Sequence, residues 1–455
     1  MSEASCAVVL FTGDLRVHDN QALAAAVAEC ELVVPAFVLD EHLLGVVGAN
    51  ANRLTFLLEC LRDLDDALRA RGARLVVKRG EPVAETIKLA RRFKARSIHV
   101  GEDRTPYARE RHERLAKACE EERIGLHSHL GSSVVAPGAL TPTGGSHYRV
   151  FTPYWRAWRA LPVRPAAPTP RQVHPPDGLP APRLPALRSL TSAKPSPELT
   201  KGGESEARRR LAGWVRGGLS HYGSTHDDLA AEDTSRLSPF LHFGCISPRT
   251  VLERCDDRPG GEEFIRQLCW RDFHRQVLAD RPDLPRADYR PRGDRWRRSP
   301  KDADAWREGL TGYPIVDAGM RQLAREGFMH NRARMVVASF LTKTLYIDWR
   351  RGAAHFASLL LDADVANNVG NWQWVAGTGN DTRPNRVLNP LRQAERFDRQ
   401  GDYVRRYVPE LADVEGRAVH QPWLLSAAER RALGYPAPIV DHAEAARELL
   451  ARRRG

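Results

Sequence analysis

Apolar and polar positions follow two different patterns along the chain, and the pattern changes near residue 206. In the first 130 residues, short apolar runs rich in Val, Leu and Ile alternate with helical patterns. The apolar runs predict five strands, at residues 7–11, 32–37, 74–78, 97–100 and 125–129. The clearest predicted helices cover residues 52–71, 83–93 and 107–122. This alternation is typical of a doubly wound parallel sheet, so the fold class is α/β in this part.

The remainder of the chain divides into a linker and a helical part. Residues 161–200 contain 11 prolines and little periodicity, which indicates an extended connection. From about residue 206 only helical patterns remain, for example at 331–345 and 353–361, and eight of the ten tryptophans lie there. The predicted organisation is an α/β domain (1–130), a Pro-rich linker (131–205) and an all-α domain (206–455). No G-x-G-x-x-G and no P-loop occurs, so an ordinary dinucleotide site is not expected in the α/β domain.

Composition excludes several classes of protein. Mean hydropathy is −0.47, and no stretch approaches the ~20 apolar residues of a membrane span, so no membrane partner is expected. The N-terminal residues lack the features of a signal peptide. Seven cysteines lie scattered without a C-x-x-C pair, which argues against a disulfide framework or a zinc site and favours a reducing cytoplasm.

The charge of the chain suggests a polyanionic partner. Net charge is +12 and the pI is about 9.6, although an arginine-rich composition can also reflect a GC-rich genome. Residues 281–301 hold eight Arg or Lys against three Asp, and Trp296 lies inside this cluster. A basic loop with an embedded aromatic suits contact with a phosphate backbone, and the alternative is a solvated surface loop.

Three further patterns leave alternatives open when the residues are considered alone. Asp362 and Asp364 form a DxD that can bind a divalent metal or serve structural roles. The hydroxyls of residues 234–238 suit a helix N-cap, a phosphate site, or both. The tryptophans of the helical part suit a buried core as well as a redox role.

Seven motifs of the helical part, taken in order, resemble the photolyase/cryptochrome flavoproteins. They are TSRLSPFLHFG (234–244), QLCWRDFHRQVL (267–278), TGYPIVDAGMRQL (311–323), FMHNRARMVVASFLTK (328–343), DWRRG (348–352), DADVANNVGNWQWVAGTG (362–379) and RVLNP (386–390). TGDLRVHDN at 12–20 resembles the N-terminal signature of the family, so the resemblance spans nearly the whole chain. It is greatest to the class I branch, whose members split cyclobutane pyrimidine dimers.

The resemblance implies a non-covalent FAD, held folded in the helical domain, and no metal. It places Arg334 against Asp362 as an ion pair beside the flavin ring, with Asn368 facing flavin N5, where an amide can both donate and accept. Arg271 adds charge to the phosphates. The whole implied FAD set is Tyr222, Thr234, Ser235, Arg236, Leu237, Ser238, Gln267, Arg271, His274, Asn331, Arg334, Asp362, Ala363, Asp364 and Asn368.

The resemblance also implies a mechanism. Trp372, Trp349 and Trp296 match an electron-transfer chain that leads from the flavin to the surface. Light-excited reduced FAD passes one electron to the dimer, the two carbon–carbon bridges open, and the electron returns. No net redox change occurs, so the implied enzyme class is a carbon–carbon lyase.

Substrate and DNA contacts follow from the same resemblance. Asn331 and Met335 occupy the places where (6-4) enzymes carry histidines, and a methionine cannot donate a proton, so cyclobutane dimers are the expected lesion. Gln267 stands where familiar class I members have a glutamate. Catalytic roles are therefore expected for Asn368, Gln267, Asn331 and Met335. Contacts to the dimer or the DNA are expected from Trp270, Trp374, Met335, Arg295 and Arg297.

Arg53 and Asp103 match antenna-binding positions of the deazaflavin-binding members, and His242 stands where a lysine is expected. The expected antenna is 8-hydroxy-5-deazaflavin, with methenyltetrahydrofolate as the alternative. A monomeric, cytoplasmic enzyme acting on UV-damaged DNA is the resulting hypothesis. A cryptochrome photoreceptor, a (6-4) photolyase and a non-photochemical DNA-binding protein are the alternative hypotheses. The sequence after the last motif is short, and this favours an enzyme over a photoreceptor with a long signalling tail.

Overall fold

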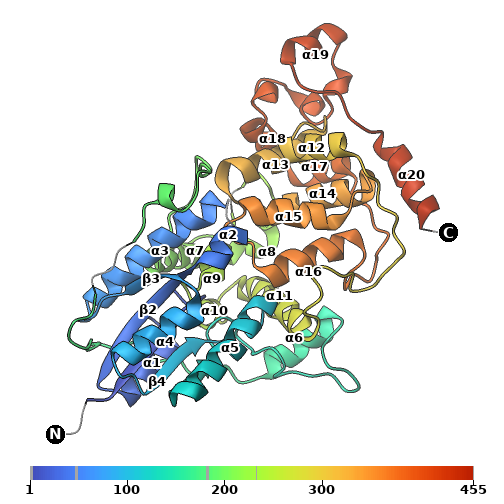
Figure 1. Ribbon diagram of the computed structural model, residues 1–455. Helices are drawn as coiled ribbons and strands as arrows, with labels where there is room; N and C mark the ends of the chain where they lie inside the picture. Colours follow the sequence, from blue (N-terminus) through green and yellow to red (C-terminus); the bar gives the residue numbers. More distant parts are fainter. Residues whose placement is uncertain (1–3, 47–49, 181–183, 232, 454–455) are drawn as a thin grey trace. The chain divides into compact units, whose positions relative to one another are not determined.

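The computed structural model describes residues 4–46, 50–180, 184–231 and 233–453 (Figure 1). The chain divides into two compact units, and each is described by itself. Unit 1 comprises Met1–Pro195, Thr200–Ser220 and Ser235–Pro282. Unit 2 comprises Ser196–Leu199, His221–Thr234 and Asp283–Gly455. The three-part division given above from composition stays a prediction.

Unit 1 is built on a five-stranded parallel sheet in the order β3-β2-β1-β4-β5, which confirms the predicted doubly wound α/β fold. The strands are β1 (Cys6–Phe11), β2 (Leu32–Asp40), β3 (Val76–Gly80), β4 (Ser97–Gly101) and β5 (Gly125–His129). All six residues of β1 are buried, because helices cover both faces of a parallel sheet. The strand order reverses between β1 and β4, where such sheets bind their ligands.

Helices cover the two faces of this sheet. Val83 and Ile87 of α4 and Leu115 of α5 share one core with Val8 of β1 and Ile98 of β4. Helix α1 packs on β1, β4 and β5. The helices of unit 1 are α1 (Gln21–Glu29), α2 (Glu41–Val46), α3 (Ala51–Arg69), α4 (Pro82–Arg92), α5 (Pro106–Glu122), α6 (Phe151–Ala160), α7 (Glu204–Arg216), α9 (Ser238–His242), α10 (Pro248–Cys255) and α11 (Gly261–Asp280).

Unit 2 is helical in its described residues. Its helices are α8 (Tyr222–Thr225), α12 (Pro300–Glu308), α13 (Pro314–Glu326), α14 (Asn331–Ser339), α15 (Trp349–Leu359), α16 (Val365–Ala376), α17 (Pro390–Phe397), α18 (Asp402–Tyr407), α19 (Ala427–Leu433) and α20 (His442–Arg452). The core is rich in indoles, as Trp306 and Trp349 are fully buried and Trp306 Nε1 donates to Val337 O at 2.9 Å.

One predicted helix is interrupted. The helical pattern at 331–345 forms α14 only as far as Ser339, and a π-helical turn, Phe340–Thr344, follows. Within this turn the buried Lys343 donates from Nζ to the carbonyls of Ala376 and Pro384. An ammonium group that is out of reach of water needs such acceptors, and the local widening of the helix accompanies them.

Helix α6 (Phe151–Ala160) lies within the predicted linker 131–205, and the proline-rich residues 161–200 carry one short 3₁₀ turn, Leu187–Ser189, among those described. The backbone of the proline-rich segment pairs with the α/β core, since Val173 N donates to Arg71 O and His174 O accepts from Val33 N. The structure thus orders this segment by hydrogen bonds that do not require a regular element. None of the helices described in residues 4–453 is long and apolar enough to cross a bilayer.

Candidate functional site

The ion pair expected between Arg334 and Asp362 is present in unit 2. Arg334 Nη1 and Nη2 donate to the two carboxylate oxygens at 3.0 and 2.9 Å, and Nε donates to Met329 O at 2.8 Å. Asp362 is nearly buried, with 5% of its side chain exposed, whereas Arg334 keeps 24%. This two-bond geometry fixes the plane of the guanidinium, which Phe328 also flanks.

Asp364 has a separate structural role. It caps helix α16, because its carboxylate accepts from the backbone N and the side-chain Nδ2 of Asn367 at 2.9 and 2.8 Å. Asp362 pairs with Arg334, so the two aspartates of the DxD are engaged with different protein donors. This arrangement favours the structural interpretation of the DxD over a metal site, and the buried Ala363 lies between them.

Asn368 follows Asp364 by one helical turn and its amide is held in place. Nδ2 donates to Ala353 O at 3.0 Å, across the contact between α15 and α16. The amide is half-buried, and with this orientation its Oδ1 remains available as an acceptor. An oriented amide close in sequence to a guanidinium–carboxylate pair is a donor and acceptor set that fits the polar edge of a flavin.

Asn331 and Met335 share one face of α14, because they lie four residues apart. Asn331 is exposed and Met335 is half-buried, so both remain accessible to a ligand. The start of the helix is fixed by His330, whose Nδ1 accepts from Arg332 N at 3.2 Å. Arg332 in turn pairs with Asp227.

The three expected redox indoles occupy different environments in unit 2. Trp372 is buried and packs against Trp306 and Phe356 with ring centroids 6.0 and 4.9 Å apart. Trp349 is fully buried and its Nε1 donates to Asp288 Oδ1 at 2.9 Å. Trp296 is half-buried and lies 5.0 Å from the ring of Tyr346. The contact between Trp306 and Trp372 could not be predicted from the sequence pattern, because the two indoles meet only through the packing of separate helices.

In unit 1, one face of α11 carries most of the remaining expected residues. Gln267, Trp270 and His274 recur at helical spacing, with Gln267 exposed and His274 buried. Trp270 stacks on Phe151 with centroids 3.8 Å apart and an interplanar angle of 3°. His274 stacks on the same indole at 5.6 Å. Phe151 was missed in the sequence, because no motif links α6 to α11.

Arg271 is anchored by main-chain carbonyls in unit 1. Its Nη2 donates to Leu241 O at 2.9 Å and its Nη1 donates to Ser132 O. The cation is therefore buried and rigidly placed, with part of its hydrogen-bonding capacity already used. The same unit holds Ser235, whose Oγ accepts from Leu237 N at 3.3 Å.

The segment around residues 234–238 is conformationally unusual. Arg236 has a φ of +48°, which is uncommon for a residue other than glycine and typical of a functional or tightly turned site. Leu237 is buried, and Ser238 is the first residue of α9. In unit 2, Thr234 is half-buried and Tyr222 begins α8, where burial raises the pKa of its phenol.

The expected antenna residues lie in unit 1. Arg53 stands in the first turn of α3, where burial lowers its pKa to about 10. Asp103 follows β4, and Arg111 interacts electrostatically with Asp103, Asp40 and Asp14. These carboxylates follow or end three parallel strands, so they gather at the carboxyl edge of the sheet. His242 is half-buried at the end of α9.

Arg111, Asp40 and Asp14 on this edge were not identified from the sequence, whereas Asp103 was. Tyr107 Oη donates to Asp40, and Asp14 lies against Gly101, where an added Cβ would come within 2.9 Å of the carboxylate. The positions of Asp14 and Asp40, shortly after the end of β1 and at the end of β2, were the one available signal in the sequence.

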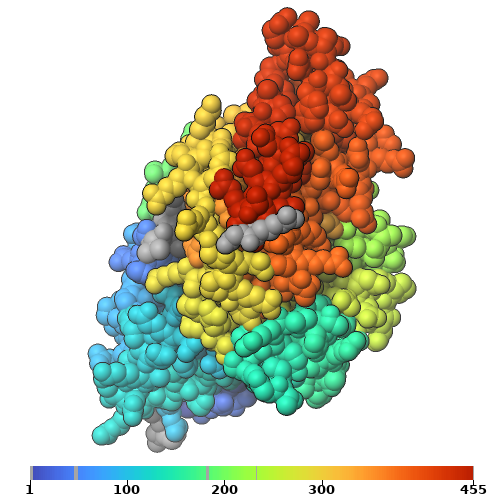
Figure 2. All heavy atoms as spheres, turned by 90° about the vertical axis from the view of Figure 1, so that its right-hand side faces the viewer, coloured from blue at the N-terminus to red at the C-terminus, as the bar shows by residue number. Residues whose placement is uncertain are grey.

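In the basic loop, residues 281–301, two aspartates do not offset the positive charge of the loop's own arginines. Its Asp288 binds Arg350 at 2.8 Å and its Asp294 binds Arg453 at 3.0 Å, so arginines outside the loop neutralise them. Arg295 is exposed, without a partner among the described residues, and Arg297 donates to Leu345 O and Asp302. Figure 2 shows this yellow segment on the surface beside the red C-terminal helix α20.

Trp374, an expected contact to the dimer or the DNA, lies in unit 2. Trp374 is half-buried beneath the guanidinium of Arg386, which lies 4.7 Å from the centroid of the indole ring.

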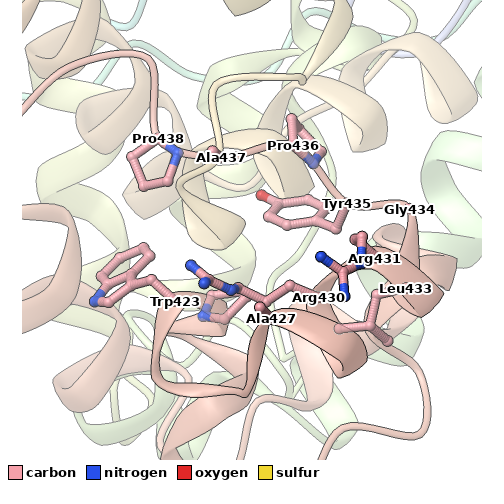
Figure 3. A pocket seen from close by; sticks show the side chains of 11 residues that line it. Trp423, Ala427, Arg430, Arg431, Leu433, Gly434, Tyr435, Pro436, Ala437 and Pro438 are labelled. Atoms are coloured by element: carbon pink, nitrogen blue, oxygen red, sulfur yellow. The ribbon is translucent and has the colours of Figure 1, made fainter.

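A hollow of about 480 Å³ lies around α19, between Trp423, Arg430 and Tyr435 (Figure 3). None of the residues expected from the sequence to bind FAD or DNA lines this hollow.

Comparison with known proteins defines the family. Residues 264–454 match the family described as the FAD binding domain of DNA photolyase, and residues 7–174 match the family described as DNA photolyase. The chain therefore belongs to the DNA photolyase family and carries its FAD-binding domain.

Individual relatives match over the full chain. A protein of Streptomyces griseus named deoxyribodipyrimidine photo-lyase is 52% identical and covered, like this chain, over 99% of its length. The solved structure of a class III photolyase from Agrobacterium tumefaciens is 34% identical with a TM-score of 0.92, covering 100% of this chain and 98% of that one. A Synechocystis cryptochrome is 30% identical with a TM-score of 0.90 and full coverage of both chains.

Proposed function

We propose that this protein repairs cyclobutane pyrimidine dimers in DNA with the energy of light. The observation that carries the proposal is the full-length 52% identity to a relative named deoxyribodipyrimidine photo-lyase. Dimer cleavage breaks two carbon–carbon bonds and consumes no net electron, so the enzyme is a lyase that needs no acid–base dyad.

FAD, when bound, supplies the photoexcited electron donor. The residues proposed to hold it in unit 2 include Arg334 and Asp362, whose paired charges orient polar groups at the flavin edge, and Asn368, whose amide Ala353 O orients. Asn368 Oδ1 can accept a hydrogen bond from a protonated nitrogen there, and the remaining Nδ2 hydrogen can be donated. The rest of the FAD set proposed from the resemblance is Tyr222, Thr234, Ser235, Arg236, Leu237, Ser238, Gln267, Arg271, His274, Asn331, Ala363 and Asp364.

Trp372, Trp349 and Trp296 are proposed to carry electrons inward from the surface. Burial of Trp372 and Trp349 protects them from water, while Trp296 is half-exposed and can meet an external reductant. The hydrogen bond from Trp349 Nε1 to Asp288 stabilises positive charge on that indole.

The dimer is proposed to contact Asn331, Met335, Gln267, Trp270 and Trp374. Indole and thioether surfaces suit an apolar, flipped-out dimer, and the two amides can hydrogen-bond to pyrimidine carbonyls. No histidine occupies position 331 or 335, so these two positions provide no imidazole for the proton transfer expected of (6-4) repair. Arg295 and Arg297 are proposed to contact the DNA backbone.

The accessory assignments rest on weaker support. Arg53, Asp103 and His242 are proposed to bind an antenna, with 8-hydroxy-5-deazaflavin preferred over methenyltetrahydrofolate. All seven cysteines are free thiols in the structure, which supports a cytoplasmic location. A monomer is the proposed oligomeric state.

Illumination tests the proposal. Chemically reduced, FAD-loaded protein is mixed with dimer-containing DNA under blue light, and restored thymines are counted against a dark control. Restoration only in the light supports repair. A flavin-loaded protein that binds the damaged DNA and restores nothing would instead favour a photoreceptor. Extraction of the bound chromophores identifies the antenna in the same preparation.

A further inference from the structure

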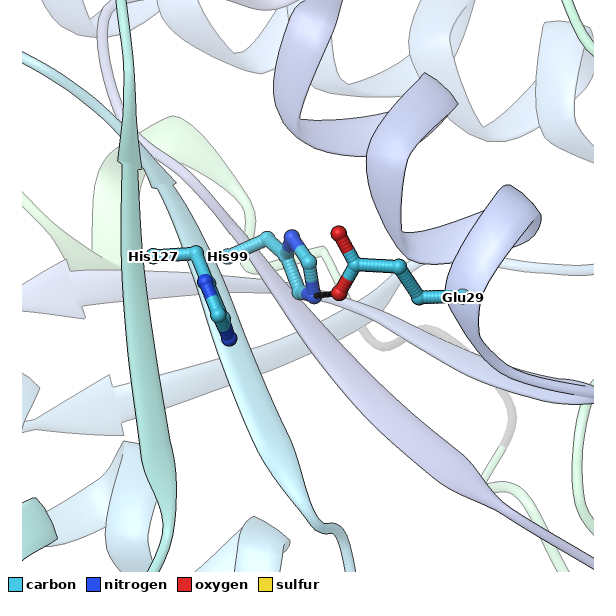
Figure 4. A group of neighbouring side chains, drawn as sticks. All are labelled: Glu29, His99 and His127. Carbon is cyan, nitrogen blue, oxygen red and sulfur yellow. Dashed lines mark ion pairs between the residues drawn. The ribbon is translucent and has the colours of Figure 1, made fainter.

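Three histidines gather on one face of the sheet in unit 1, at the edge formed by β5. His99 of β4 stands directly opposite His127 of β5 in the parallel register. His129 lies two residues beyond His127, so its side chain points to the same face. Glu29, the last residue of α1, approaches the cluster from the helix that covers this face (Figure 4). None of these residues belongs to the proposed FAD, DNA or antenna sets.

The potential ligand atoms of this cluster converge. One carboxylate oxygen of Glu29 and one ring nitrogen each of His99 and His127 all lie within 4.8 Å of one another. The Glu29 oxygen lies 3.4 Å from His99 Nε2. His99 is fully buried, whereas His127 and Glu29 are exposed. The ring of His99 is therefore held in place, while the side chains of His127 and Glu29 have room to change rotamer.

In one of its two neutral tautomers, His99 can offer Nε2 to a cation. His99 Nδ1 lies 3.0 Å from His129 Nε2, so a single proton is shared between these two atoms. When His99 carries that proton, its Nε2 is a lone pair that faces the Glu29 carboxylate, with Ser97 Oγ 3.1 Å away. In this tautomer the lone pair and the carboxylate repel each other, and a cation between them, like a hydrogen bond from the Ser97 hydroxyl, relieves that repulsion.

We infer that Glu29, His99 and His127 form a binding site for a divalent first-row transition metal ion of the Zn²⁺ type. His99 binds through Nε2 and donates from Nδ1 to His129, which is the outer hydrogen bond that orients metal-bound histidines. Two imidazoles and a carboxylate are a borderline ligand set preferred by such ions, and a water completes the coordination.

The geometry needs only a modest contraction. Ligand atoms around a tetrahedral Zn²⁺ lie about 3.3 Å apart, given metal–ligand bonds of about 2.0–2.2 Å. Glu29 and His99 already meet this distance at 3.4 Å. His127 stacks on His99 with centroids 4.8 Å apart, so its exposed ring must turn to direct a nitrogen at the ion. No sequence motif indicated this site, because the three ligands are contributed by three separate elements.

The test uses tag-free, FAD-loaded protein that has been stripped with a chelator and titrated with ZnCl₂ by calorimetry. The wild-type protein is expected to bind one Zn²⁺. His127→Ala and Glu29→Gln are expected to weaken binding at least tenfold, and His129→Ala by roughly 10–100-fold as an outer partner. His112→Ala, which removes an exposed histidine of α5, is the matched control and should leave the affinity unchanged.

A second readout protects the test against misfolding. Cu²⁺ added to the wild-type protein should give an electron paramagnetic resonance spectrum with coupling to two nitrogens, reduced to one in His127→Ala. Circular dichroism shows whether each variant is folded. Two results would overturn the inference: no stoichiometric Zn²⁺ binding by the wild-type protein, or equal affinities of the folded His127→Ala and His112→Ala variants.

Discussion

Replacing Arg334 with alanine tests whether its ion pair with Asp362 contributes more to stability than an exposed ion pair does, and whether the pair helps to hold FAD as proposed. Arg334→Ala removes two hydrogen bonds, of 3.0 and 2.9 Å, from the carboxylate of Asp362, whose side chain is 5% exposed in the intact pair. Breaking a fully buried pair costs about 3–5 kcal/mol, and an exposed pair contributes about 0–1 kcal/mol. Because a quarter of Arg334 is exposed, the expected loss is about 2–3 kcal/mol, between these limits.

The matched control is Arg325→Ala in the same unit. Arg325 also donates two hydrogen bonds, to Glu198 at 2.7 and 2.6 Å, but the side chains are 46% and 49% exposed. It should cost at most about 1 kcal/mol. Urea denaturation followed by circular dichroism compares the variants, and flavin fluorescence after dilution reports FAD release.

Three outcomes distinguish the explanations. Arg334→Ala is expected to lower the urea midpoint more than Arg325→Ala and to release FAD more readily, while Arg334→Lys recovers only part of both, since a lysine cannot make the two-bond contact. Equal midpoints for the two alanine variants would refute the burial argument. A destabilised Arg334→Ala that retains wild-type FAD affinity would remove this pair from the proposed flavin site.

Other predictions address electron transfer, DNA contact and packing. Trp296→Phe should block light-driven reduction of bound FAD but spare repair by pre-reduced enzyme; loss of both activities would make Trp296 structural. The Arg295→Ala, Arg297→Ala double variant should lower the salt slope of damaged-DNA binding by about two units, and an unchanged slope would exclude the loop. Gly352→Ala places a Cβ 2.2 Å from Trp372 Cη2 and should destabilise by about 1–3 kcal/mol. Gly213→Ala, a helical position with open space around it, should slightly stabilise the protein. Thermal melting compares the two glycine variants with the wild-type protein.

The sequence predicted the sheet well because its signal is local. Short runs rich in Val, Leu or Ile located all five strands, and β5 was placed at its observed bounds. The helix predicted over residues 52–71 is observed as α3, and Leu58, Leu61 and Leu64 are buried at helical spacing along it. Periodicity reports which residues leave water, and both elements bury a regular set.

Long-range and strained features could not be read in this way. The π-helical turn at Phe340–Thr344 depends on carbonyls of Ala376 and Pro384 that lie far along the chain. Likewise, the resemblance suggested Arg334 with Asp362, but only the structure shows that Ala353 O orients Asn368. The cluster of His99 and its neighbours has no signature, because pairing of two parallel strands creates it.

Repair of each lesion in isolation tests the central claim most directly. The reduced, FAD-loaded enzyme is given DNA with a single cyclobutane dimer, or DNA with a single (6-4) product, under blue light, and the products are separated by chromatography. The account predicts restoration of the dimer alone, reduced in Asn331→Ala with FAD still bound, and retained or raised in Gln267→Glu. Repair of the (6-4) product with none of the dimer would contradict it.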